Sequence, residues 1–154
     1  TVNCSASASK YIAEKVRESG LLKQFPHVDG VVPITHRSGC AMQYEGPDHR
    51  QLERTLAGFA KHPNVAGYIL IGLGCEITQT SHLLENEGLI QLGAGGPSGP
   101  TVLNIQDSGG IAKTVEAGVR AVAELLPRVN DARRVELPAR HLILGTNCGG
   151  SDGN

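Results

Sequence analysis

Cysteines are the residues of this sequence best suited to chemistry, and three of the four share one local context. Cys4, Cys75 and Cys148 each stand at the end of a strand-like run, in a strand–cysteine–helix setting. Cys40 lies six residues after a further run of this kind, and His36 is on the same loop. In an open parallel sheet the loops after the strands meet at one edge, where ligands bind. We therefore expect these cysteines to lie close together in space.

The spacing of the cysteines leaves several kinds of chemistry open. There is no CxxC pair, which argues against a zinc ribbon and against a thioredoxin-type redox pair. Thiols near helix N-termini have lowered pKa values and act as nucleophiles or metal ligands. A single nucleophilic cysteine would need a base such as His36 and would leave the other thiols unexplained. A site for iron or another soft metal would use several thiols, whereas a free cysteine can also be a small buried apolar residue.

Two further segments carry candidate groups. Glu76, next to Cys75, is a candidate ligand or general base, or a carboxylate that interacts favourably with a helix N-terminus. The run Gln106–Gly110 precedes a long helical pattern and is either an anion-binding turn or a tight glycine turn. Neither GxGxxG nor GxxxxGK[ST] is present, which disfavours NAD and ATP.

Short apolar runs alternate with helical patterns, and this alternation predicts the elements that must position these groups. The strands are expected at Val28–Ile34, Val65–Ile71, Thr101–Ile105 and His141–Leu144. The helices are expected around Ile12 and Val16, from Asp48 to Pro63, around Leu83 and Leu84, and from Gly109 to the residue before Pro127. This order predicts an α/β fold, a three-layer Rossmann-like domain with a mostly parallel sheet, as a single domain over residues 1–154.

Composition excludes several classes of protein. Fourteen Lys and Arg balance fifteen Asp and Glu, so no basic surface for nucleic acid is expected. The longest apolar runs, such as Val65–Leu73, are far shorter than the roughly 20 residues that a membrane span needs. No charged-then-apolar leader is visible, so we expect a cytoplasmic protein with reduced thiols.

Five motifs, in order along the chain, resemble the altronate/galactarate dehydratase family. They are Thr1-Val2-Asn3-Cys4, Thr35-His36-Arg37-Ser38-Gly39-Cys40, His62-Pro63-Asn64, Gly72-Leu73-Gly74-Cys75-Glu76 and Cys148-Gly149-Gly150-Ser151-Asp152-Gly153. The resemblance covers the chain from end to end. It departs from the family at Ile77-Thr78, where polar Asn is frequent, and at Arg37, which adds a charge to the His–Cys loop.

The resemblance implies a sugar-acid dehydratase that eliminates water to give a 2-keto-3-deoxy acid and uses Fe(2+). Another divalent metal or an iron–sulfur cluster is compatible with the same thiols. It also implies that the chain is a central portion of a larger enzyme, whose remaining domains and sugar-acid substrate are its partners, and a homo-oligomer is compatible with it. A sulfolactate sulfo-lyase branch shares these motifs and eliminates sulfite instead of water.

The resemblance and the chemistry together assign a role to each candidate residue. Removing a weakly acidic proton beside a carboxylate requires a base, a departing hydroxide requires an acid, and a metal stabilises the enediolate. We assign proton transfer to His36 and Glu76, substrate binding to Arg37, Ser151 and Asp152, and metal binding to Cys4, Cys40, Cys75 and Cys148. Two other classes stay open: a thiol-transfer enzyme with one reactive cysteine, and a ligand-binding module without catalysis.

Overall fold

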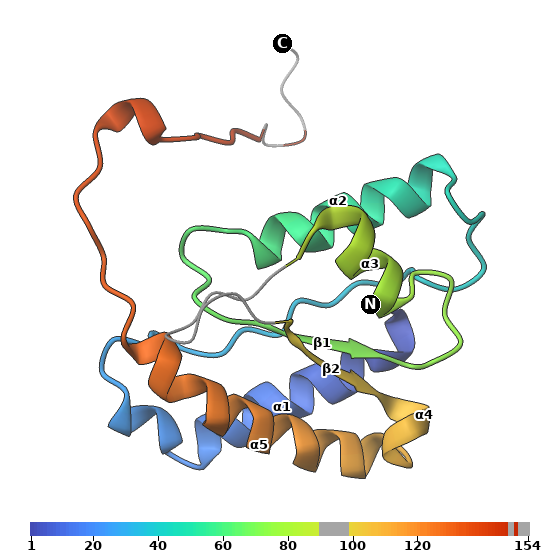
Figure 1. The fold of residues 1–154 in the computed structure, drawn as a ribbon, viewed down its shortest axis with the longest axis horizontal. Helices are drawn as coiled ribbons and strands as arrows, with labels where there is room; N and C mark the ends of the chain where they lie inside the picture. Colours follow the sequence, from blue (N-terminus) through green and yellow to red (C-terminus); the bar gives the residue numbers. More distant parts are fainter. Residues whose placement is uncertain (90–98, 148–149, 151–154) are drawn as a thin grey trace.

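The computed structural model describes residues 1–89, 99–147 and 150 of the chain (Figure 1). Its α-helices are α1 (Ala6–Glu18), α2 (Pro47–Ala60), α3 (Thr80–Glu87), α4 (Ile105–Ser108) and α5 (Ile111–Asn130). Its strands are β1 (Ile69–Gly72) and β2 (Thr101–Asn104), and short 3₁₀ turns cover Asn3–Ser5, Leu21–Gln24 and Ala139–His141. The chain is therefore a mixed helix and strand structure.

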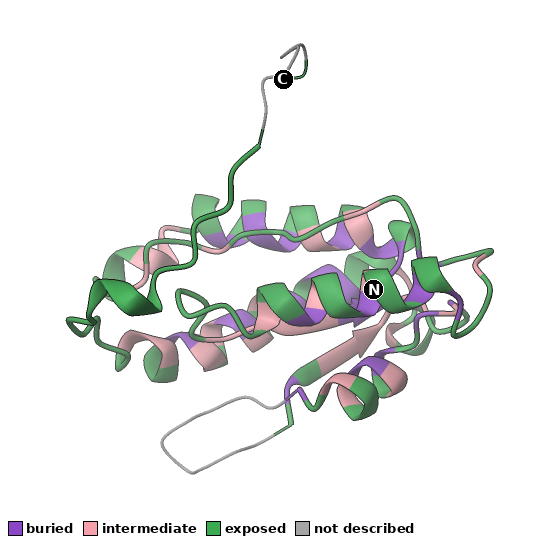
Figure 2. Ribbon diagram, turned by 90° about the horizontal axis from the view of Figure 1, so that it is seen from above, coloured by how far each residue is buried: buried purple, intermediate pink, exposed green. Residues whose placement is uncertain are grey.

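The two strands form a small parallel sheet with helices on both faces. Ile69 pairs with Thr101 and Gly72 with Asn104. Successive side chains of a strand point to opposite faces, and β1 shows this clearly. Ile69 and Ile71 join one apolar cluster with α1 and α5, while Leu70 joins a second cluster with α2 and α3 (Figures 1 and 2).

The first cluster depends on a close crossing of α1 and α5. Ile12 and Val16 are one helical turn apart on α1, and both are buried, as their spacing predicts. Gly118 of α5 lies directly against Ile12, because a Cβ atom at Gly118 would stand 2.2 Å from the Ile12 Cδ1 atom. The absence of a side chain at Gly118 is what allows the two helices to approach this closely.

The second cluster joins α2 and α3 through Ala57, Leu83 and Leu89. The predicted helix at this place begins one residue earlier than expected, with Pro47 at its first position, where the missing N–H has no helical partner anyway. Helix α3 ends at Gly88, which adopts the left-handed conformation typical of a helix C-terminus.

Over the part of the chain that the structure describes, the strands are shorter or fewer than predicted. The described residues contain only the two-stranded sheet, so a larger Rossmann-like sheet is not formed by them. Segment 28–34 is extended but unpaired, and Val32 is 74% exposed; Pro33 removes one ladder donor there. The predicted strand over 65–71 pairs only from Ile69 onward. Segment 141–144 is also unpaired, because it has left the body of the protein and Ile143 is 94% exposed.

Helix α5 continues one turn beyond the predicted stop at Pro127 and ends at Asn130. Pro127 costs the helix one backbone hydrogen bond, while Leu126 beside it is buried in the first cluster and holds this turn on the sheet. After Asn130 the chain leaves the body in an extended path (Figure 1). Among the described residues there is no helix with the length and apolar character of a membrane span.

Candidate functional site

Three loops and the start of the chain meet where β1 and β2 end. The Asn3 N–H donates to the Ser38 carbonyl at 2.9 Å, and the Ile77 N–H donates to the Gly39 carbonyl at 3.1 Å. The turn after β2 joins them through the Gln106 N–H, which donates to the Leu73 carbonyl at 3.1 Å. This is the carboxyl edge of the sheet, the place where open parallel sheets bind ligands. Residues 1–5, 36–40, 73–78 and 104–106 thus form one edge, which we call the loop edge.

Glu76 ties the loop edge together. Its side chain is buried and accepts hydrogen bonds from the Leu73 N–H at 3.1 Å, the Gly74 N–H at 2.6 Å and the Thr1 hydroxyl at 2.8 Å. Burial alone would raise the pKa of this carboxyl. The hydrogen bonds from the backbone of Glu76, Gly74 and Leu73 and from Thr1 outweigh it, so the pKa is lowered. Glu76 is therefore held as a carboxylate with its oxygens already engaged.

Neighbouring atoms approach two glycines of the loop edge so closely that no side chain fits there. A Cβ atom at Gly72 would stand 2.4 Å from Glu76 Oε1. Gly39 has a φ of +102°, and a Cβ there would stand 2.6 Å from the Thr1 carbonyl oxygen. Any larger residue would push the Glu76 carboxylate or the first residues of the chain away from the edge.

Three of the predicted cysteines lie on the loop edge. Cys4, Cys40 and Cys75 are all exposed free thiols. The pKa of Cys40 is raised by partial desolvation and then by the neighbouring Cys4 and Cys75, with Glu76 contributing least. The Gln106 amide nitrogen lies 3.5 Å from the Cys75 sulfur, and the Cys4 sulfur lies 3.5 Å from Asn3 Oδ1. Loops far apart in sequence thus bring these thiols to one surface, as the strand–cysteine–helix pattern predicts.

The described residues do not form a complete set of metal ligands. Within residues 1–89, 99–147 and 150, no three His, Cys, Asp or Glu side chains converge as metal ligands do. Cys148, Ser151 and Asp152 lie outside the described residues. The metal and substrate assignments of these residues stay predictions.

His36 lies on the same loop as Cys40. Its Nδ1 atom accepts a hydrogen bond from the Ser38 N–H at 3.1 Å, and its Nε2 atom is buried without a partner among the described residues. Burial lowers the pKa of the imidazole, against the opposing effect of the Thr1 backbone. The ring is therefore neutral near pH 7, with its Nδ1 lone pair engaged by the Ser38 N–H. The neighbouring Arg37 side chain is exposed.

Residues that the sequence analysis missed support the loop edge. Thr1 bonds both Glu76 and, through its amino nitrogen, the Ile71 carbonyl at 2.8 Å. Gln106 had a signal, because it opens the run Gln106–Gly110. In the structure the Gly109 and Gly110 N–H groups bond carbonyls of Gln106 and Ile105, so this run is a tight glycine turn. The Gln106 side chain, rather than its backbone, reaches the Cys75 sulfur.

A cluster of Tyr44, His49 and His82 anchors the loop that follows Cys40. The Tyr44 ring lies 5.3 Å from the rings of both His49 on α2 and His82 on α3. His49 is buried, with Nδ1 3.7 Å from Glu53 Oε2. Tyr44 therefore connects the Cys40 loop to the helices on one face of the sheet.

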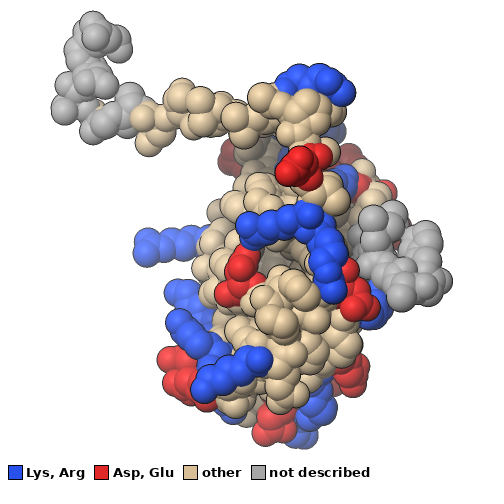
Figure 3. Space-filling view, turned by 90° about the vertical axis from the view of Figure 1, so that its left-hand side faces the viewer, with Lys and Arg blue, Asp and Glu red and all other residues tan. Residues whose placement is uncertain are grey.

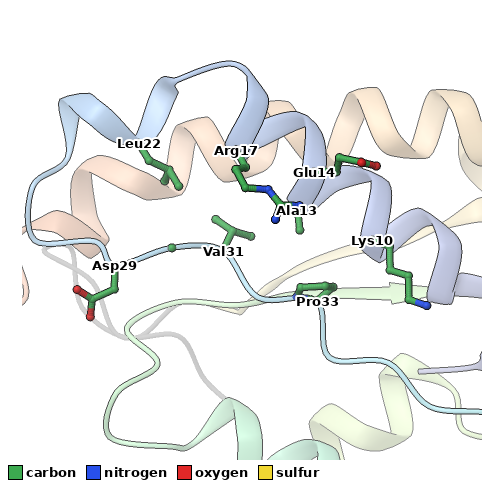
Figure 4. Close-up of a pocket in the computed structure, with 9 residues that line it drawn as sticks. Lys10, Ala13, Glu14, Arg17, Leu22, Asp29, Val31 and Pro33 are labelled. Atoms are coloured by element: carbon green, nitrogen blue, oxygen red, sulfur yellow. The ribbon is translucent and has the colours of Figure 1, made fainter.

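The surface between α1 and residues 29–33 carries charged side chains of both signs. A groove of about 500 Å³ between α1 and residues 29–33 carries Lys10 and Arg17 together with Glu14 and Asp29, and none of the predicted site residues lines it (Figure 4). Positive and negative side chains alternate on the face shown in Figure 3. This face has no field of one sign that would select a nucleic acid.

Comparison with known proteins identifies a family and several relatives that resemble this chain. Residues 1–130 match the family described as D-galactarate dehydratase/Altronate hydrolase, second domain. The chain is 30% identical over 154 residues to an altronate dehydratase of Bacillus subtilis (strain 168), covering 99% of this chain and 28% of the relative. It is 33% identical over 155 residues to a galactarate dehydratase (L-threo-forming) of Escherichia coli (strain K12), covering 99% and 29%.

An altronate dehydratase of Escherichia coli (strain K12) is 30% identical over 125 residues, covering 81% of this chain and 23% of the relative. The chain therefore spans less than a third of the length of these relatives. No solved structure matches it significantly. The match over residues 1–130 shows that the chain belongs to the D-galactarate dehydratase/altronate hydrolase family, in which this region is the second domain.

Proposed function

We propose that this chain forms part of the active site of a metal-dependent hydro-lyase, which dehydrates a sugar acid of the altronate or galactarate type to a 2-keto-3-deoxy acid. The observation that carries the proposal is the gathering of His36 with the thiols of Cys4, Cys40 and Cys75 on the loop edge of a chain from this family. The named relatives are dehydratases of altronate and galactarate.

The donor set fits a soft divalent metal such as Fe(2+). Cys4, Cys40 and Cys75, with Cys148 beyond the described residues, would hold it. The raised pKa of Cys40 reflects desolvation and the repulsion expected between neighbouring thiolates, and a bound cation would relieve that repulsion. When bound, the metal supplies a positive charge that stabilises the substrate carboxylate and hydroxyl oxygens as negative charge develops.

The proton transfer falls to His36. A neutral imidazole with a lowered pKa can take the proton from the carbon beside the substrate carboxylate near pH 7. Because Ser38 occupies Nδ1, the substrate has to displace this N–H for the ring to act as a base there. Arg37 is exposed on the same loop and would bind a substrate carboxylate.

Glu76 holds the loop edge in this proposal. The sequence predicts proton transfer for Glu76, but its lowered pKa and engaged oxygens suit a positioning residue better than a base. Loss of Glu76 would therefore move Thr1 and the Cys75 turn and act on the reaction through them.

The proposal is tested on the full-length protein purified without oxygen. We expect 2-keto-3-deoxy acid to form from galactarate or altronate, and we expect Cys75→Ser to lower iron content and kcat together. Wild-type iron content and rate in Cys75→Ser would end the assignment of that ligand. Absence of turnover of both acids by the iron-loaded enzyme would refute the dehydratase, and release of sulfite from sulfolactate would move it to the sulfo-lyase branch.

A further inference from the structure

An apolar trough of about 450 Å³ runs along the edge of β1 that faces away from β2. Its two walls are the extended segments 28–34 and 64–71. Helices α1 and α5 line it from one side and α2 from the other. In Figure 1 the segment 28–34 runs in the same direction as β1. The trough is thus bounded by two extended segments and covered by helices, as a strand inside a layered sheet would be.

Both walls present backbone groups that a neighbouring strand would satisfy. The Ile71 carbonyl points into the trough, because it accepts the Thr1 amino nitrogen at 2.8 Å. Backbone groups of a parallel strand alternate between its two sides, so Ile69 faces the same way. On the opposite wall, residues 30–34 make no backbone hydrogen bond with another described segment. Such an edge is a template for strand addition.

Several apolar side chains that line the trough are exposed to solvent. Val32 is 74% exposed, Ile34 42%, Phe59 47% and Val65 38%, and all four line the trough. A continuous apolar surface of this kind marks a place where another segment docks.

The first residues of the chain lie at one end of the trough. Thr1 bonds Ile71 of β1 on one side, while Asn3 bonds Ser38, just beyond the other wall, at 2.9 Å. Thr1 is itself one of the lining residues. Residues 1–3 therefore lie between the two walls, and a strand continuing backwards from Thr1 enters the trough.

We propose that a further β-strand occupies the trough, and that the residues directly before Thr1 in the intact protein form this strand. The relatives are several times longer than this chain. The sheet order would then be 28–34, the inserted strand, β1 and β2. Helix α1 would be the crossover between the inserted strand and 28–34, as in a βαβ unit. The exposed segment Leu142–Leu144 and a second copy of the chain are the competing occupants, but neither is continuous with Thr1.

Amide hydrogen exchange on the intact protein and on residues 1–154 tests this proposal. In the intact protein we expect the amides of Ile69, Ile71 and the alternate non-proline residues of 30–34 that face the inserted strand to exchange at least tenfold more slowly than in residues 1–154, while the amides of α5 exchange at the same rate in both. The residues directly before Thr1 should be protected to the same degree. Proline two positions before Thr1 should remove this protection while the amides of α5 stay slow, because proline cannot donate in a central strand.

Phe59→Ser and Tyr11→Ser in the intact protein form a matched pair. Both residues are half-exposed aromatics on helices, but only Phe59 lines the trough. Phe59→Ser should speed exchange of the trough amides severalfold, and Tyr11→Ser should leave it unchanged. Fast exchange of the residues before Thr1 in an intact protein with a protected α5 would overturn the proposal. Protection in residues 1–154 that is lost on removing residues 132–154, or on dilution, would assign the trough to the tail or to a second copy.

Discussion

Replacing Glu76 by Gln should destabilise the protein in a way that depends on pH. Gln keeps the size of the side chain and one carbonyl oxygen for the Leu73 and Gly74 N–H groups. The Thr1 hydroxyl can rotate and accept from the new amide. What is lost is the negative charge on the two backbone contacts. A hydrogen bond to a charged group contributes about 1 kcal/mol more than a neutral one, so the loss is about 2 kcal/mol near pH 7.

The pH dependence follows from the lowered pKa of Glu76. A carboxyl whose pKa is lower in the folded state than in the unfolded chain stabilises the fold above its unfolded pKa. This stabilisation disappears as the pH falls through the folded value. The unfolded value is near 4.5. The difference between wild type and Glu76→Gln should therefore be constant from pH 7 to pH 5 and shrink below about 4.5.

Urea unfolding at pH 7, 5 and 3.5 measures this difference. Glu14→Gln is the matched control, since Glu14 is exposed on α1, and it should change the free energy of unfolding by less than about 0.5 kcal/mol at every pH. Glu76→Ala, which leaves two N–H groups without an acceptor, should cost about 3–5 kcal/mol. A loss in Glu76→Gln that is the same at pH 7 and pH 3.5, or no loss at all, would refute the role given to the carboxylate.

Three further outcomes are expected. Gly118→Ala should lower the free energy of unfolding in urea by about 1–3 kcal/mol, because its methyl group meets Ile12. Adding Ile12→Val should recover part of this loss. A double variant no more stable than Gly118→Ala would contradict the close crossing of α1 and α5. Cys40 should react with iodoacetamide at pH 8 more slowly than glutathione, since its pKa is raised, and should react faster once Cys4 and Cys75 are Ser; equal rates before and after would mean that the thiols are not neighbours. In the full-length enzyme, His36→Asn should lower kcat by roughly 10²–10⁴-fold with iron retained, while His27→Asn, an exposed histidine on the far loop, should not; an unchanged rate in His36→Asn would remove it from the proton transfer.

The repeated strand–cysteine–helix context was enough to predict that Cys4 and Cys75 lie on one edge, because parallel strands end together whatever their order. Helical spacing was equally sufficient for Ile12 and Val16. The incorrect predictions concern which extended segments pair as strands. The apolar run 28–34 has strand character, but a strand needs a neighbour, and sequence alone does not reveal whether one is present. The sequence drew attention to Gln106 only as part of a turn. It did not reveal the contacts of Thr1 and Gln106, which join residues 75 and 31 positions apart.

The two apolar clusters can form at different times during synthesis on the ribosome. The cluster around Ala57 and Leu83 is complete once Leu89 has been made. The cluster around Ile12 and Val16 needs Val122 and Leu126, more than a hundred residues later. At ribosomal rates of about 5–20 residues per second, α1 presents its apolar face without its partner for roughly 5–20 s. A nascent chain should therefore gain its α2–α3 half first and engage a chaperone through α1, and this dependence should end when α5 leaves the ribosome.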